Sequence, residues 1–152
     1  MVLRNRSAVV SLSVMVFGSL SLAGDDSVAE VKAKELKKFQ GTWILLSGEK
    51  GGEQMPAEQI KSVKLVFKDN KIKVSLNGKE DHVQEFEIDP GKSPKEINLT
   101  RELNGQKSTV VGIYSFDGKT LKLCGDDFGK ERPTEFSTKD KPSYTMLVLK
   151  RD

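Results

Sequence analysis

The chain has 152 residues, enough for one domain with a single core and no disulfide staples. Its 25 lysines and arginines are interleaved with 22 aspartates and glutamates, and no basic run carries the stacking aromatics of a nucleic-acid groove, so no nucleic-acid partner is expected. One histidine and one cysteine argue against zinc, haem and iron–sulfur sites, and neither a metal nor another cofactor is predicted.

The N-terminal segment has the features of a secretory signal. Arg4 and Arg6 precede an uncharged run over residues 7–22, and Ser21 and Ala23 are small residues at the two positions that a signal peptidase reads. Cleavage after Ala23 is predicted, and losing both arginines lowers the formal net charge from +3 to +1. A retained anchor is the weaker interpretation, because serines break the run and it is short for a membrane span. The sequence therefore predicts a secreted or periplasmic protein with no membrane span after signal cleavage.

A helix is predicted over residues 24–40. Ser27 and Glu30 have the spacing of a capping box, and Gly41 follows the last helical residue. Four apolar residues fall on one face of this helix: Val28, Val31, Leu36 and Phe39. This face is expected to cover one end of the domain.

Eight segments of alternating or β-branched residues predict an all-β domain over residues 41–152. Asn77-Gly78 and Asn104-Gly105 suit two-residue hairpin turns. A meander of eight antiparallel strands hides its edges by closing into an up-and-down barrel, with an open sheet packed on the helix as the alternative. The predicted strands are residues 42–49, 63–68, 71–76, 82–89, 95–103, 108–116, 119–124 and 144–151.

Closure of the barrel makes a specific prediction about its two end strands. With eight strands the last is antiparallel to the first, which places Trp43 beside Arg151. A guanidinium over the indole would help to close that end of the barrel, together with the helix. A full strand at residues 134–137 would change the parity of the count and break this pairing.

The first strand also carries a family resemblance. Gly41-Thr42-Trp43 resembles the G-x-W signature of lipocalins, whose tryptophan is covered by a basic residue from the far end of the barrel. Residues 36–151 resemble a family of exported planctomycete domains of unknown function, described as lipocalin-like. The resemblance implies a barrel and export, and supplies no catalytic residues. The matching segments are LKKFQGTWILLSGEKGGEQMP, LVFKDNKI, GIYSFDGKTLKLC, GKERPTEFST and LVLKR.

Polar residues at one end of the strands suggest a binding site. If the strand over residues 82–89 is regular, His82 and Gln84 share its inner face with Phe86, and Arg101 is on the inner face of the next strand. Such groups would line the upper part of a cavity and orient a ligand with a polar head, whereas a bulge or fraying would leave them in solvent. Long loops over residues 49–61 and 125–143 gather at the same mouth. The candidate ligand-binding residues are His82, Gln84, Arg101, Tyr114, Met55 and Arg132.

The stretch CGDDFGKERPTEF, residues 124–136, collects several reactive residue types. Cys124 is a free thiol, a link to another chain or a buried small residue, and no orienting partner supports a nucleophilic pair with His82. The spacing of Asp126 and Asp127 is not that of an EF-hand, and solvated loop charges are the default. Arg132 is expected to pin the loop through Glu131 and Glu135. No catalytic residue is predicted.

The leading hypothesis is a non-enzymatic, exported, lipocalin-like barrel. It would bind a small apolar or amphipathic ligand, or an envelope protein, at its mouth. The alternative is a structural or protein-interaction module of the cell envelope with a solid barrel, and an enzyme of unknown type is the third.

Overall fold

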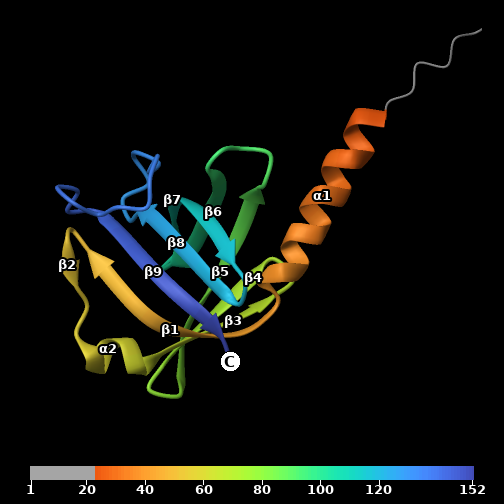
Figure 1. Ribbon diagram of the computed structural model, residues 1–152. Coiled ribbons are helices and arrows are strands. Elements are labelled where there is room, and N and C mark those ends of the chain that lie inside the picture. The colour runs from red at the N-terminus through yellow and green to blue at the C-terminus, as the bar shows by residue number, and fades with distance from the viewer. Residues whose placement is uncertain (1–22) are drawn as a thin grey trace, which may run out of the picture.

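The computed structural model describes residues 23–152, with side chains from residue 26 onward. The predicted signal segment lies outside this part, except for Ala23, which begins the first helix. Helix α1 (Ala23–Phe39) leads into a closed, eight-stranded antiparallel barrel, and the two-residue strand β2 (Glu53–Gln54) and helix α2 (Ala57–Ser62) lie between the first two barrel strands (Figure 1). The barrel strands are β1 (Gly41–Lys50), β3 (Val63–Lys68), β4 (Lys71–Leu76), β5 (Lys79–Asp89), β6 (Lys95–Leu103), β7 (Gln106–Asp117), β8 (Thr120–Asp126) and β9 (Tyr144–Arg151).

The predicted up-and-down closure is confirmed. Each barrel strand pairs with the next in the chain, and β1 pairs with β9 to complete the circle. Residues 134–137 form no strand, so the parity holds and Trp43 is the register partner of Arg151. We call the end at Trp43 the closed end. The opposite end, the mouth, carries residues 51–62 and 127–143 and the two hairpin turns at residues 77–78 and 104–105.

The two hairpin turns have the backbone that their sequences predict. Asn77 and Gly78 have φ angles of 52° and 78°, and Asn104 and Gly105 have φ angles of 53° and 76°. A type I′ turn requires positive φ at both central residues, and asparagine and glycine tolerate it with the least strain. The turn at residues 104–105 sets the antiparallel register of β6 with β7 along its whole length. The turn at residues 77–78 sets the pairing of β4 with β5 only next to the turn, because the register shifts between Val74 and Ser75.

Aromatic side chains fill the closed half of the barrel. Phe39, at the end of α1, is fully buried, and its ring centroid lies 4.8–5.5 Å from the centroids of four other rings. Trp43 packs against Phe116, and its Nε1 donates a hydrogen bond of 2.6 Å to the carbonyl oxygen of Phe39. The end of the helix therefore plugs the barrel. The four rings around Phe39 are those of Phe67, Phe86, Tyr114 and Phe116.

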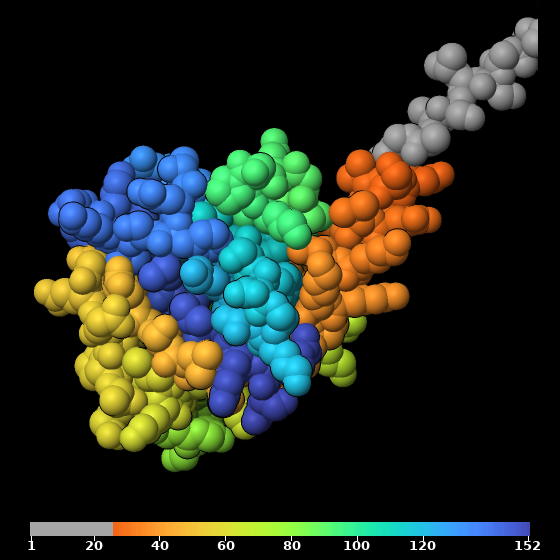
Figure 2. Space-filling view, in the orientation of Figure 1, coloured from red at the N-terminus to blue at the C-terminus, as the bar shows by residue number. Residues whose placement is uncertain are grey.

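The first half of α1 departs from prediction. The helix spans Ala23–Phe39, within one residue of the predicted bounds, but Ser27 lies inside it and is therefore not its N-cap. Asp26 in the first turn favours a start before Ser27, because a carboxylate stabilises the positive end of a helix. Val28 and Val31 are 64% and 52% exposed, since the helix axis leads away from the barrel and only its last turns pack on it (Figures 1 and 2).

Candidate functional site

The mouth half of the barrel holds a cavity of about 190 Å³ above the aromatic base. A cavity of about 150 Å³ in another protein core accommodates benzene, so this space has room for one ring or a short alkyl chain. Apolar side chains form most of its wall, and Gln84, Thr145 and Asp127 add polar groups. The Asp127 carboxylate accepts a hydrogen bond from Thr145 at 2.9 Å and pairs with Lys50 at 2.8 Å. The apolar lining consists of Ile97, Leu99, Val110, Leu123 and Leu147.

Paired glycines help to create this cavity. Gly112 on β7 is the register partner of Gly125 on β8, and both line the cavity. A Cβ atom on Gly112 would lie 2.7 Å from the carbonyl oxygen of Cys124, and one on Gly125 would lie 2.7 Å from Cγ1 of Val110. The glycines allow the two strands to approach closely, and the side chain of Val110 packs directly over Gly125 in the cavity wall.

Met55 lies at the mouth, as predicted for a residue of the long first loop. Its backbone N–H donates a 2.8 Å hydrogen bond to the carbonyl oxygen of Gly48. Its sulfur packs on Gly48, so closely that a Cβ atom at position 48 would collide with the sulfur. Gly48 is the register partner of Leu147, which belongs to the cavity wall. Met55 is not among the residues that line the cavity, and its flexible thioether packs at the mouth next to Leu147, which does line it.

Only one of the three predicted polar wall residues reaches the cavity. From His82 to Asp89 the burial of β5 alternates regularly, so His82 and Gln84 share the inner face with Phe86. Gln84 lines the cavity, whereas the His82 ring has its Nδ1 2.5 Å from a carboxylate oxygen of Asp81. Arg101 is exposed. Thr100 is the last residue of β6 that pairs with β5, and β6 continues beyond it without a neighbour on that side.

Tyr114 lies in the closed half of the barrel, away from the cavity. Its side chain is 1% exposed, and its hydroxyl has no hydrogen-bond partner among the described residues. Burial, together with the nearby carboxylate of Glu35, raises the pKa of the Tyr114 phenol well above its ordinary value. Glu35 is itself buried and accepts hydrogen bonds from Lys95 at 2.6 Å and from Lys38 at 2.9 Å. Tyr114 is part of the helix–barrel junction.

Arg132 fastens the 127–143 loop to the outer surface of the barrel. Its Nη1 donates to the carbonyl oxygens of Ile97 and Gly112 at 3.2 and 2.7 Å, and its Nη2 donates to Asn98 at 2.8 Å. Its Nε lies 3.5 Å from a carboxylate oxygen of Glu96. The predicted pairing with Glu131 and Glu135 is therefore wrong, because Arg132 finds its partners on β6 and β7. Its donors are engaged outside the cavity.

A second, smaller core lies beneath this loop and was not predicted. Cys124 is 1% exposed, with its Sγ 3.8 Å from the carbonyl oxygen of Ser137. Burial raises the pKa of its thiol, which makes it a poor nucleophile. The sequence did contain a signal for this outer core. Cys124 is an apolar residue on the outward face of β8, the face that also carries Lys122. The other members of this outer core are Ile113, Tyr144, Phe136 and Met146.

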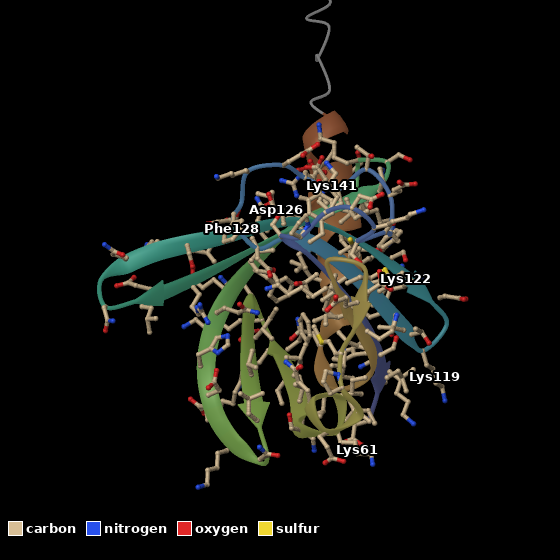
Figure 3. All side chains as sticks on the ribbon, turned by 90° about the vertical axis from the view of Figure 1, so that its left-hand side faces the viewer. Lys61, Lys119, Lys122, Asp126, Phe128 and Lys141 are labelled. Carbon is tan, nitrogen blue, oxygen red and sulfur yellow. The ribbon has the colours of Figure 1, made fainter. Side chains whose placement is uncertain are left out.

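Asp126 stabilises the same loop, contrary to the expectation of solvated charges. It is 2% exposed and accepts hydrogen bonds from the backbone N–H groups of Phe128, Lys130 and Glu131 at 3.1, 3.0 and 2.8 Å (Figure 3). Burial by itself raises the pKa of the carboxyl, but these donors outweigh it and the net pKa is lowered. Within residues 23–152, no three acidic, histidine or cysteine side chains are grouped to hold a metal ion.

The barrel and its cavity define the class of this protein. It is an eight-stranded, antiparallel, up-and-down barrel of lipocalin-like architecture with an N-terminal helix. Comparison of the chain with protein-family models, curated proteins and solved structures gives no match, so membership of the planctomycete family stays a prediction. In the part of the chain that the structure describes, no helix combines the length and apolar character needed to cross a bilayer.

Proposed function

We propose that this protein is an exported, non-enzymatic barrel that binds a small, partly apolar ligand in the cavity at its mouth. The observation that carries the proposal is the cavity of about 190 Å³ with a mostly apolar wall. Buried aromatic side chains fill the other half of the barrel, which limits a ligand to the mouth. Export rests on the sequence of residues 1–23 and belongs to the proposal.

The size of the cavity sets the expected affinity. Burying each methylene group contributes about 0.8 kcal/mol, so a chain of about five to seven methylene groups gives a dissociation constant of roughly 1 mM to 0.1 mM. Polar contacts at the rim, where Gln84 and Thr145 lie, would add specificity. Native mass spectrometry of the exported protein would detect a ligand that remains bound during purification.

A titration of the full chain with hexan-1-ol tests the proposal. NMR should detect chemical-shift changes at the methyl groups of Leu99, Leu123 and Leu147, which line the cavity. Val110→Phe fills the cavity and should abolish these changes, whereas Val28→Phe, the same substitution at an exposed position of α1, should leave them intact. Methyl signals that do not respond, or that respond equally in folded Val110→Phe, would rule out the cavity as the site. Leu99→Phe replaces Val110→Phe if the latter does not fold.

A separate observation favours the alternative, an interaction module of the cell envelope. A groove of about 560 Å³ lies between the projecting half of α1 and the β5–β6 connection, and the exposed Val28 and Val31 line it beside Pro90. A photo-crosslinking residue at position 31 should capture an envelope protein if this groove binds one, and the same residue at Lys34 serves as control. Equal capture at both positions would argue against the groove.

A further inference from the structure

The wall of the barrel is split at the mouth between β5 and β6. Strand β5 pairs with β6 only from Glu85 to Asp89, and the part of β5 nearer the mouth pairs with β4 alone. Beyond Thr100, β6 in turn pairs only with β7. Figure 3, which views the molecule from the mouth side, shows the β6–β7 hairpin diverging from β4 and β5. We call this opening the β5–β6 slot.

A depression of about 180 Å³ lies on the β5–β6 slot. Gln84 lines both this depression and the inner cavity, so it stands between the two. Its side-chain amide has no hydrogen-bond partner among the described residues, although the residue is partly buried. The amide is thus available to a molecule that passes from one space to the other.

Two acid–base couples border the slot. Lys71 is the register partner of Glu85, and Lys107 is the register partner of Glu102. Within the described residues neither couple approaches to ion-pair distance, so all four charged groups are available to a ligand. Two ammonium groups and two carboxylates attract and repel a singly charged head to similar extents, whereas a head that carries both charges can align with them.

On the assumption that the proposed function holds, we propose that the ligand enters sideways through the β5–β6 slot. It is a short apolar chain that bears a zwitterionic head. The chain occupies the inner cavity, the head lies among Lys71, Glu85, Glu102 and Lys107, and the Gln84 amide binds at the junction of chain and head.

Three probes with chains of similar length separate the possible heads: 2-aminooctanoic acid, octanoic acid and octylamine. Each is titrated into the full chain and followed by NMR. The methyl groups of Leu123 and Leu147 report on the chain, and the backbone amides of Val83 and Thr100 report on the head. We expect 2-aminooctanoic acid to shift both sets and to bind up to about fivefold more tightly than either singly charged probe, which is the effect of an exposed ion pair.

Charge variants of the slot sharpen the test. The double variant Glu85→Gln with Glu102→Gln should transfer the preference to octanoic acid, and Lys71→Gln with Lys107→Gln should transfer it to octylamine. Lys119→Gln, at the closed end between β7 and β8, is the control and should change nothing. Equal binding of all three probes, or an unchanged preference in both double variants, overturns the assignment of the head.

The route and the proposed function fail in different ways. Shifts at Leu123 and Leu147, accompanied by changes at Met55 and none at Val83 or Thr100, would place entry at the top of the mouth. That result overturns the β5–β6 slot and leaves the cavity as the binding site. No response of the cavity methyl groups to any probe, hexan-1-ol included, overturns the proposed function itself.

Discussion

The guanidinium of Arg151 lies over the indole of Trp43, with its central carbon 4.5 Å from the ring centroid. Its Nη1 and Nη2 donate hydrogen bonds to the carbonyl oxygens of Gln40 at 2.5 Å and Lys38 at 2.7 Å. These carbonyls lie at the end of α1, where the helix leaves orphan acceptors. A single side chain at the end of β9 therefore joins the last strand to the first strand and to the helix.

Arg151→Ala should lower the free energy of unfolding by about 1–2 kcal/mol, because it removes a cation–π contact and two hydrogen bonds from a charged donor at a partly solvated site. Arg151→Lys should recover only part of this, since an ammonium group lacks the planar fork. Urea unfolding followed by the fluorescence of Trp43 measures both. Lys150→Ala, the adjacent outward position, is the matched control. Equal stability of Arg151→Ala and the wild type would contradict the proposed role of the contact.

A second prediction concerns how readily the Cys124 thiol becomes accessible. The loop that Arg132 fastens to β6 and β7 covers Cys124. Arg132→Ala removes the hydrogen bonds to β6 and β7 and should increase opening of the loop, which exposes the thiol. Labelling of Cys124 by a thiol reagent should then become at least about tenfold faster, the effect of a change of about 1.4 kcal/mol in the opening equilibrium. Lys141→Ala removes an exposed ion pair to Glu131 in the same loop and should have little effect. Equal acceleration in both variants would show that Arg132 has no special role.

The parts of the fold that could be predicted depend on local patterns. The two-residue period identified the strands, and the Asn-Gly pairs identified the turns, because side-chain alternation and positive φ are properties of neighbouring residues. The contact between Trp43 and Arg151 is long-range, yet it followed from strand parity alone.

The parts that could not be predicted depend on where distant segments meet. Arg132 donates hydrogen bonds to carbonyl groups 20 and 35 positions away in the chain. The prediction chose Glu131 and Glu135 because they are the nearest carboxylates in the sequence, and it was wrong. Tyr114 was a candidate ligand residue, but the position of the aromatic base determines which half of the barrel it fills. The β5–β6 slot arises from where the pairing of β5 with β6 stops, which the alternation of either strand alone does not specify.

The buried carboxyl of Asp126 predicts a pH dependence of stability. Its pKa in the folded protein is lowered, whereas in the unfolded chain it is about 3.9. A group with a depressed folded pKa contributes stability above the unfolded pKa, and that contribution is lost as the pH falls through the folded pKa. Asp126→Asn should therefore unfold at lower urea concentration than the wild type at pH 7.

The difference between Asp126→Asn and the wild type should shrink below about pH 4, where the Asp126 carboxyl of the unfolded wild type takes up a proton, and it should disappear once the pH falls below the lowered pKa of the folded state. Urea midpoints measured from pH 7 to pH 2.5 test this expectation. Asp117→Asn, at an exposed position before the β7–β8 turn, is the control and should follow the wild type throughout. A difference between Asp126→Asn and the wild type that does not vary with pH would exclude the carboxylate as its cause.

Two variants of Tyr114 distinguish a structural role of this residue from a role in ligand binding. Because this buried O–H has no partner among the described residues, Tyr114→Phe removes an unsatisfied polar group. Its free energy of unfolding should equal that of the wild type or exceed it by up to about 1 kcal/mol. Tyr114→Ala should instead lose about 3–5 kcal/mol, since it leaves a void beside Phe39 and Phe116.

The same two variants report on binding. Tyr114 lies in the closed half of the barrel, so Tyr114→Phe should bind hexan-1-ol with the wild-type affinity in the NMR titration. A loss of stability above about 1 kcal/mol in Tyr114→Phe would indicate that the phenol donates a hydrogen bond to the Glu35 carboxylate, the nearest acceptor that affects its pKa. A loss of hexan-1-ol affinity with unchanged stability would instead return Tyr114 to the binding site, because a group that only supports the helix–barrel junction has no contact with the ligand.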